Sequence, residues 1–225
     1  LLLTAYCRNQ KLLNRIFGHI DDYTELLLPN NLLSGDEIVE LINDNDAIDE
    51  ADYKEVELIG WLYQFYISDK KDEVFASFKK KKKARPEDIP AVTQIFTPKW
   101  IVKYMVENTV GRIWLDKHPD SPIRSEMKYF VEPSDKENYK PEPIIDDITQ
   151  LTLLDPASGS GHILVVGFDL MMKMYKEEGY STRNAVEGII KNNLYGLDID
   201  DRATQLANFA VLIKAASYYP DILKS

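Results

Sequence analysis

Apolar residues recur at helical spacing through the first third of this chain. They predict one or two short helices within residues 1–34, and Ser34 followed by Glu37 predicts the capped start of another helix. An aromatic-rich run from Val56 to Phe78 predicts a further helix, whose aromatic side chains we expect in the core. Residues 1–88 are therefore predicted to form an all-α region.

Pro86 and Pro90 indicate a boundary, and we expect residues 89–225 to form a second unit. It opens with a short amphipathic helix that includes Trp100 and ends near Gly111. The segment 116–147 holds five of the eleven prolines and shows no sustained periodicity. It is predicted to be a surface insertion.

After this insertion, the pattern of apolar residues changes from helical spacing to short continuous apolar runs. The short β-type run 151–154 precedes Asp155-Pro-Ala-Ser-Gly159-Ser-Gly161 and an apolar helix through about Lys176. A second apolar run, 194–200, precedes another helix. Strand, glycine-rich turn and helix is the layout of a doubly wound sheet, with the turn at the carboxyl end of the strand. The predicted fold class is therefore α/β: a partial Rossmann-like sheet preceded by the all-α region.

The polar residues of this layout suit a nucleoside ligand. Asp198 follows the second strand, where a carboxylate accepts hydrogen bonds from both ribose hydroxyls. Gly159 and Gly161 permit backbone conformations that a side chain would block. We expect Asp200 to cap the following helix and His162 to be a surface residue at a helix start.

Elimination narrows the choice of nucleotide. The chain contains no Gly-x-x-x-x-Gly-Lys-Ser/Thr phosphate loop, and Leu164 occupies the third glycine position of the dinucleotide fingerprint. Asp155, just before the turn, would repel a diphosphate but would attract an ammonium group. S-adenosylmethionine offers both an ammonium group and a ribose, and it is the predicted cofactor.

Net charge alone argues against a nucleic-acid partner, because 27 Lys and Arg face 37 Asp and Glu, which gives −10. The charges are segregated, however. Residues 36–57 contain ten acidic residues and one lysine, whereas residues 69–104 contain ten basic residues, including Lys79–Lys83, against five acidic ones. A lysine run of this kind forms either a solvated surface or a phosphate contact.

Cysteine content and apolar run length indicate the cellular compartment of the protein. Cys7 is the single cysteine, no Cys/His cluster has metal-ligand spacing, and no apolar run is long enough to cross a bilayer. We therefore expect a cytoplasmic protein with no metal and no membrane partner.

Three motifs resemble those of adenine-N6 DNA methyltransferases. Asp155-Pro-Ala-Ser-Gly-Ser-Gly161 resembles their cofactor loop, in which cysteine is common where Ser158 stands here. Tyr195-Gly-Leu-Asp-Ile-Asp200 and Gln94-Ile-Phe-Thr-Pro98 resemble their second-strand and N-terminal motifs. Together with the stretch from Gly60-Trp-Leu-Tyr to Lys83, they look most like the PglX type of BREX phage-defence systems. Type I and type IIG restriction-modification methylases are similar.

The resemblance implies a role for each matching residue. The N-terminal motif would line the methionine side of the cofactor, and Asp155 would face the methionine amino group. Asp198 would hold the ribose hydroxyls, and Ile199 would pack on the adenine. The implied cofactor-binding residues are Phe96, Thr97, Pro98, Asp155, Ala157, Ser158, Gly159, Gly161, Asp198 and Ile199.

One motif of the family is missing from this sequence. The family holds the flipped target adenine with an Asn-Pro-Pro-Tyr/Phe motif, and no Pro-Pro pair occurs here. We therefore assign no catalytic residue. We expect the N-terminal, cofactor-binding part of a longer enzyme, inactive alone, which meets DNA through the full-length protein and associates with defence-system subunits. A non-catalytic S-adenosylmethionine-binding interaction module and a protein glutamine methyltransferase stay open as alternatives.

Overall fold

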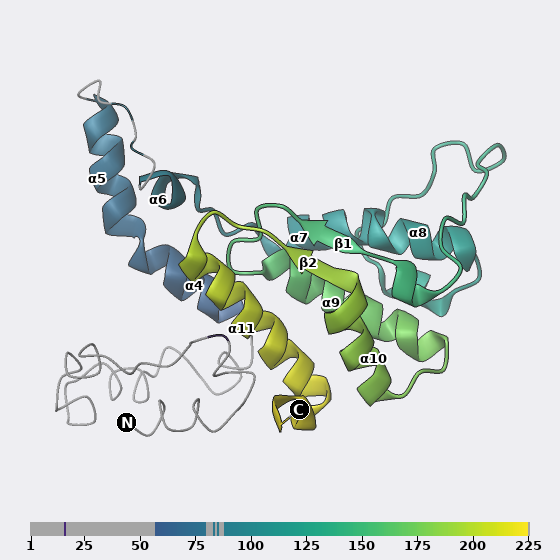
Figure 1. Ribbon diagram of the computed structural model, residues 1–225. Helices are drawn as coiled ribbons and strands as arrows, with labels where there is room; N and C mark the ends of the chain where they lie inside the picture. Colours follow the sequence, from purple (N-terminus) through teal and green to yellow (C-terminus); the bar gives the residue numbers. More distant parts are fainter. Residues whose placement is uncertain (1–15, 17–56, 80–82, 84, 86–87, 225) are drawn as a thin grey trace, which may run out of the picture.

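The computed structural model describes residues 16, 57–79, 83, 85 and 88–224 (Figure 1). The helices predicted within residues 1–50 lie outside this range, apart from the helical Ile16. Described residues are mostly helical, with one parallel sheet of two strands. The elements are α4 (Glu57–Tyr66), α5 (Ser68–Lys79), α6 (Ile89–Thr93), α7 (Lys99–Asn108), α8 (Val110–Lys117), η4 (Pro122–Glu126), η5 (Ile148–Gln150), β1 (Leu153–Asp155), α9 (His162–Glu177), α10 (Thr182–Gly188), the π-helix η6 (Ile189–Asn193), β2 (Leu194–Gly196), α11 (Asp201–Tyr218) and η7 (Pro220–Lys224).

The two strands pair in parallel, with Leu153 opposite Leu194. Helix α9 covers one face of this sheet, and it approaches closely because Gly167 has no side chain: a Cβ there would lie 2.4 Å from Cδ2 of Leu153. The opposite face carries Leu154 and Tyr195, which are 56% and 49% exposed. Helical packing in the described structure therefore covers only one side of the sheet.

Helix α9 is the central element of the core, as the apolar periodicity after Gly161 predicted. It packs against α7, α8, α10 and α11 as well as both strands (Figure 1). It ends at Glu177, and the left-handed Gly179 two residues later donates its N–H to the carbonyl of Lys176. The largest fully buried side chains of the fold are Trp114, Tyr175, Phe168, Ile148, Leu151, Met171, Met172, Met174 and Ile189.

Asn193 fixes the start of the second strand. Its side chain is fully buried and donates to the carbonyls of Ile148 and Leu151, at 2.8 and 2.7 Å. It also accepts a hydrogen bond from the hydroxyl of Tyr175 at 2.8 Å. The residue before β2 is thereby tied both to the segment that enters β1 and to α9.

The aromatic run 56–78 differs from its prediction in two ways. It forms two helices, α4 and α5, and the Ser68 hydroxyl at the break donates to the carbonyl of Phe65. Its aromatic side chains do not all enter the core, because Trp61 and Phe65 are 54% and 70% exposed, whereas Tyr63 is buried. Helix α4 packs on α11, whereas α5 packs on the short helix α6, and Trp61 and Phe65 stay largely uncovered (Figure 1).

The amphipathic helix predicted to end near Gly111 is also two helices, α7 and α8, which meet at Thr109. Asn108 donates from its side chain to the carbonyls of Tyr104 and Tyr129, so that it fastens the following segment at this break.

The segment 116–147 is a surface segment only in part. Residues 131–144 are mainly exposed, but Ile123, Met127, Phe130 and Ile145 are buried in the core. Isolated apolar residues in a Pro-rich stretch leave no periodic signal, and this is why the sequence did not reveal them.

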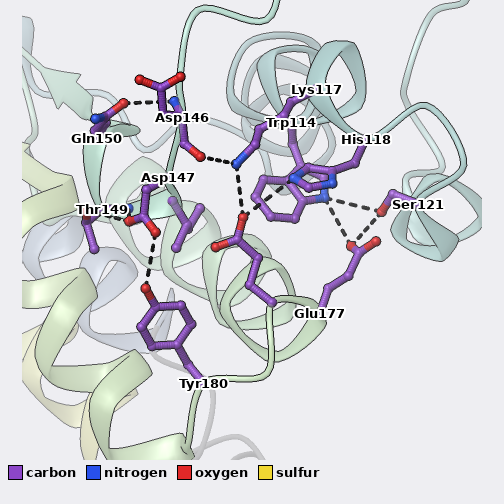
Figure 2. A network of polar contacts seen from close by, with 12 residues as sticks. Trp114, Lys117, His118, Ser121, Asp146, Asp147, Thr149, Gln150, Glu177 and Tyr180 are labelled. Carbon is purple, nitrogen blue, oxygen red and sulfur yellow. Dashed lines mark hydrogen bonds and ion pairs between the residues drawn. The ribbon is translucent and has the colours of Figure 1, made fainter.

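Polar contacts hold the two ends of this segment (Figure 2). Trp114 donates from its indole N–H to Ser121 and to Glu177, and the Ser121 hydroxyl donates to Glu177 at 2.7 Å. Nearby, Lys117 contacts the carbonyl of Asp146 and pairs with the carboxylate of Glu178 at 3.2 Å. The contacts attach the segment to the end of α9.

None of the helices in the described residues combines the length and apolarity needed to cross a membrane.

Candidate cofactor site

Three loops meet at the carboxyl end of the sheet: residues 155–161 after β1, residues 197–200 after β2, and residues 94–98 between α6 and α7. The first two loops extend the strand pairing. Leu197 N–H donates to the carbonyl of Asp155, and Ser158 N–H donates to the carbonyl of Leu197, both at 2.9 Å. The loops that carry the two predicted acids are therefore neighbours.

The glycine loop contains two left-handed residues, with φ of +51° at Gly159 and +86° at Gly161. This is the conformational freedom that the sequence predicted. Gly161 has a second role, since a Cβ there would lie 2.9 Å from the Cα of Ala207 in α11. The loop is therefore packed directly on the helix that follows the second strand.

Asp198 joins the two strand-end loops. Its carboxylate accepts a hydrogen bond from Gly159 N–H at 2.8 Å and another from Asp200 N–H at 2.9 Å, one on each oxygen. Each carboxylate oxygen can accept a second bond. The half-buried side chain can therefore hold the loop and still accept from two hydroxyls of a ligand. Asp200 caps α11 as predicted, because its side chain accepts from Arg202 N–H at 3.0 Å.

Asp155 is a buried acid at the end of β1. It is 6% exposed, and no Lys or Arg of the described residues forms an ion pair with it. Burial raises the pKa of the Asp155 carboxyl above its usual value; the N–H of Ala157, at 3.1 Å, opposes this rise and the charge of Asp198 adds to it. A ligand ammonium would supply the missing positive charge.

The 94–98 loop packs on the start of α9. The ring of Phe96 stacks on His162, with 4.6 Å between ring centroids and 7° between their planes. His162 Nδ1 lies 3.0 Å from the carbonyl oxygen of Thr97, so this nitrogen carries the proton. Pro98 begins α7 as its N-terminal cap.

His162 begins α9, as predicted, but the prediction of a surface position was wrong. It is only 8% exposed, because the 94–98 loop, distant in sequence, covers it.

The other predicted residues differ in their exposure to solvent. Ser158 is buried beneath the loop, whereas Ala157 is exposed and Ile199 is 72% exposed. A groove of about 510 Å³ runs between β2, α10 and α11, and Ser158 is the only one of the ten predicted residues in its lining. The other nine predicted residues lie outside the lining of this groove, which meets the predicted site at Ser158.

Three residues of α4 contact the site and were not predicted. Tyr63 donates from its hydroxyl to Asp200, Gln64 accepts from Phe96 N–H at 3.2 Å, and Gly60 lies against Phe96. The stretch beginning at Gly60 contributed to the family resemblance. Nothing in its spacing, however, indicates contacts with loops more than 30 and 130 residues away.

The described residues contain no group of three His, Cys, Asp or Glu side chains that could hold a metal ion.

Comparison with known proteins shows a similarity to DNA methyltransferases. The family model described as MmeI, DNA-methyltransferase domain, matches residues 132–221, a region that contains both strands, the glycine loop and Asp198. Over these residues the chain is therefore similar to a DNA-methyltransferase domain.

Two curated relatives make the relationship more specific. The adenine-specific methyltransferase BrxX of Escherichia coli O9:H4 is 47% identical over 209 residues, which are 89% of this chain and 16% of BrxX. The adenine-specific methyltransferase PglX of Lacticaseibacillus casei is 41% identical over 215 residues, 90% of this chain and 18% of PglX. A putative type II restriction enzyme and methyltransferase of Methanocaldococcus jannaschii is 29% identical over half of the chain.

The resemblance to the PglX type is confirmed over most of the chain, which spans about a sixth of the length of BrxX and PglX.

Proposed function

We propose that this chain is the N-terminal, cofactor-binding part of a site-specific DNA adenine-N6 methyltransferase of phage defence or restriction-modification. One observation carries the proposal: Asp155 and Asp198 flank a left-handed glycine loop at the ends of two adjacent parallel strands. The site offers a carboxylate for an ammonium group and another for ribose hydroxyls. S-adenosylmethionine carries both groups, and when bound it would supply the methyl group.

Each predicted residue takes a role in this arrangement. Asp155 pairs with the methionine ammonium, and Asp198 accepts from the ribose hydroxyls while it keeps its bond to Gly159. Ile199, which is exposed, packs on the adenine. Phe96, Thr97 and Pro98 line the methionine side of the cofactor. The loop residues Ala157, Ser158, Gly159 and Gly161 surround the methionine moiety.

The complete fold in this proposal is a Rossmann-like sheet. The face with Leu154 and Tyr195 is apolar and exposed, and in doubly wound sheets helices cover both faces. Further strands and helices of the longer enzyme would cover this face. We propose residues 1–88 as a helical region and residues 89–225 as the first part of the methyltransferase domain.

The proposed macromolecular partners are DNA, reached through the full-length enzyme in the cytoplasm, and protein subunits of the defence system. The names of BrxX and PglX as adenine-specific methyltransferases favour this function over an interaction module or a protein glutamine methyltransferase. The Lys79–Lys83 run lies mainly outside the described residues.

Calorimetric titration with S-adenosylmethionine tests the proposal. We expect the wild-type chain to bind and Asp198→Ala to bind about 10- to 100-fold more weakly, because a hydrogen bond to a charged group contributes about 1.5–3 kcal/mol. Asp201→Ala is the matched control, since it removes an exposed carboxylate three residues away and should leave affinity unchanged.

A second ligand separates the ribose contact from damage to the loop. Wild type should prefer the cofactor over its 2′-deoxy analogue, and Asp198→Ala should lose this preference. Equal affinities of wild type and Asp198→Ala for the cofactor would remove the ribose assignment.

Activity provides an independent test. With tritiated cofactor and an adenine-containing duplex, the 225-residue chain should transfer no label to DNA, because its sequence contains no Asn-Pro-Pro-Tyr/Phe motif. Transfer of label by this chain alone would contradict the proposal that it binds the cofactor but lacks the catalytic motif.

A further inference from the structure

The helix α4 lies against all three loops of the candidate site, although it belongs to the region that the sequence assigned to a separate helical unit. Its Gly60 permits the closest approach, since a Cβ there would lie 2.4 Å from Cε2 of Phe96 and 2.6 Å from Oγ of Ser160. A larger residue at this position would displace the helix from both the 94–98 loop and the glycine loop.

The side chains around Gly60 hold the 94–98 loop. The ring of Trp61 meets Phe96 edge to face, with 5.8 Å between centroids and 68° between planes. Gln64 accepts from the N–H of Phe96 through its side-chain oxygen. Phe96 is therefore fixed from one side by α4 and from the other by its stacking on His162.

Tyr63 connects the same helix to the carboxylate assigned to ribose. Its buried hydroxyl donates to Oδ2 of Asp200. Asp200 N–H donates to one oxygen of Asp198, and Gly159 N–H donates to the other. An unbroken series of hydrogen bonds thus runs from α4 through the second-strand loop to the glycine loop.

We propose that Tyr63 and Gln64 are positioning residues of the cofactor site: Tyr63 sets the orientation of Asp198 through Asp200, and Gln64 sets the 94–98 loop. This inference rests on the proposed function. It makes α4 a structural part of the cofactor site and not a neighbour of it.

Substitutions at Tyr63 and Gln64 can remove a hydrogen bond without removing much side-chain packing. Tyr63→Phe removes a single hydroxyl and keeps the buried ring, so the fold should survive while Asp200 loses one of its bonds. Gln64 is exposed, and its replacement removes little packing. Gln64→Ala removes the acceptor for Phe96 N–H, whereas Gln64→Glu keeps an acceptor oxygen at the same place.

A double-mutant cycle on the 225-residue chain, read by calorimetric titration with S-adenosylmethionine, tests the positioning role. We expect Tyr63→Phe to weaken binding roughly three- to tenfold in the wild-type background and less than about twofold in Asp198→Ala. Tyr104→Phe, on the exposed side of α7, is the matched control and should change neither background. Gln64→Ala should weaken binding, and Gln64→Glu should restore it.

The outcomes separate the two proposals. Two results would overturn the positioning role of Tyr63 alone while the wild type still binds the cofactor. In the first, Tyr63→Phe binds the cofactor as tightly as wild type. In the second, the affinity lost in Tyr63→Phe simply adds to the affinity lost in Asp198→Ala. A folded wild type that does not bind the cofactor overturns the proposed function and this inference with it. If Tyr63→Phe lowers the melting temperature substantially, the positioning role is tested by Gln64→Ala and Gln64→Glu instead. Equal cofactor affinities of these two variants would overturn it.

Discussion

Asp198 accepts a hydrogen bond from the backbone N–H of Gly159 at 2.8 Å, across 39 residues of sequence. The carboxylate at the end of the second strand therefore shapes the glycine loop at the end of the first. Ligand binding and loop conformation are coupled in this arrangement, because both depend on one side chain.

Gly161→Ala should destabilise the chain more than Gly179→Ala. Both glycines are left-handed, at φ +86° and +85°, but a Cβ at Gly161 would lie 2.9 Å from Ala207, whereas nothing lies within 4 Å of one at Gly179. We expect losses of about 1–2 kcal/mol at Gly179 from backbone strain and about 2–4 kcal/mol at Gly161 from strain and overpacking. Urea unfolding measures both, and equal losses would contradict the packing role of Gly161.

Asp155→Asn should alter the pH dependence of stability. Because burial raises the pKa of the Asp155 carboxyl, the folded state binds more protons than the unfolded state over the pH range from 3.8, the ordinary value, up to the raised pKa of the folded state. Wild-type stability should therefore fall, relative to Asp155→Asn, as the pH rises above 3.8. Urea unfolding over a pH series checks this, with the exposed Asp201→Asn as control.

Cofactor affinity should show the opposite trend. The ionised Asp155 attracts the ammonium group, so affinity in wild type should rise over the same pH range, and Asp155→Asn should flatten this rise. Parallel pH profiles for the two proteins would contradict the ammonium assignment.

Asn193→Ala should destabilise the chain by about 3 kcal/mol, because two buried carbonyls, of Ile148 and Leu151, lose their donor. Tyr175→Phe should cost about 1 kcal/mol, since it removes the hydroxyl that donates to Asn193 but leaves both carbonyls with their donor. Asn138→Ala, in an exposed loop, is the control and should stay within about 0.5 kcal/mol in urea unfolding.

Leu154→Thr tests the proposed extension of the sheet. Leu154 is 56% exposed, so the substitution should change the stability of the 225-residue chain by less than about 1 kcal/mol. In the longer enzyme that we propose, the same substitution should cost about 2 kcal/mol or more, because the side chain becomes buried. Leu153→Thr, on the face covered by α9, should be costly in both.

The sequence alone determined the elements that depend on local pattern. The apolar run before Asp155, the glycines that follow it and the periodicity to Lys176 predicted β1, the left-handed loop and α9. Asp200 was predicted as a helix cap from its residue type and position, and this was possible because a cap bonds locally: its side chain accepts from the N–H of Arg202, two residues away. These features follow from backbone conformation and from short-range hydrogen bonding.

Only the tertiary structure decided which distant residues meet. His162 is buried because the 94–98 loop packs on it, four side chains of residues 116–147 enter the core, and α4 places Tyr63 beside Asp200, 137 residues away. No periodicity records such contacts, because they depend on how helices dock and not on the residues adjacent in the chain. The motifs therefore indicated the chemistry of the site, whereas packing determined what holds it in place.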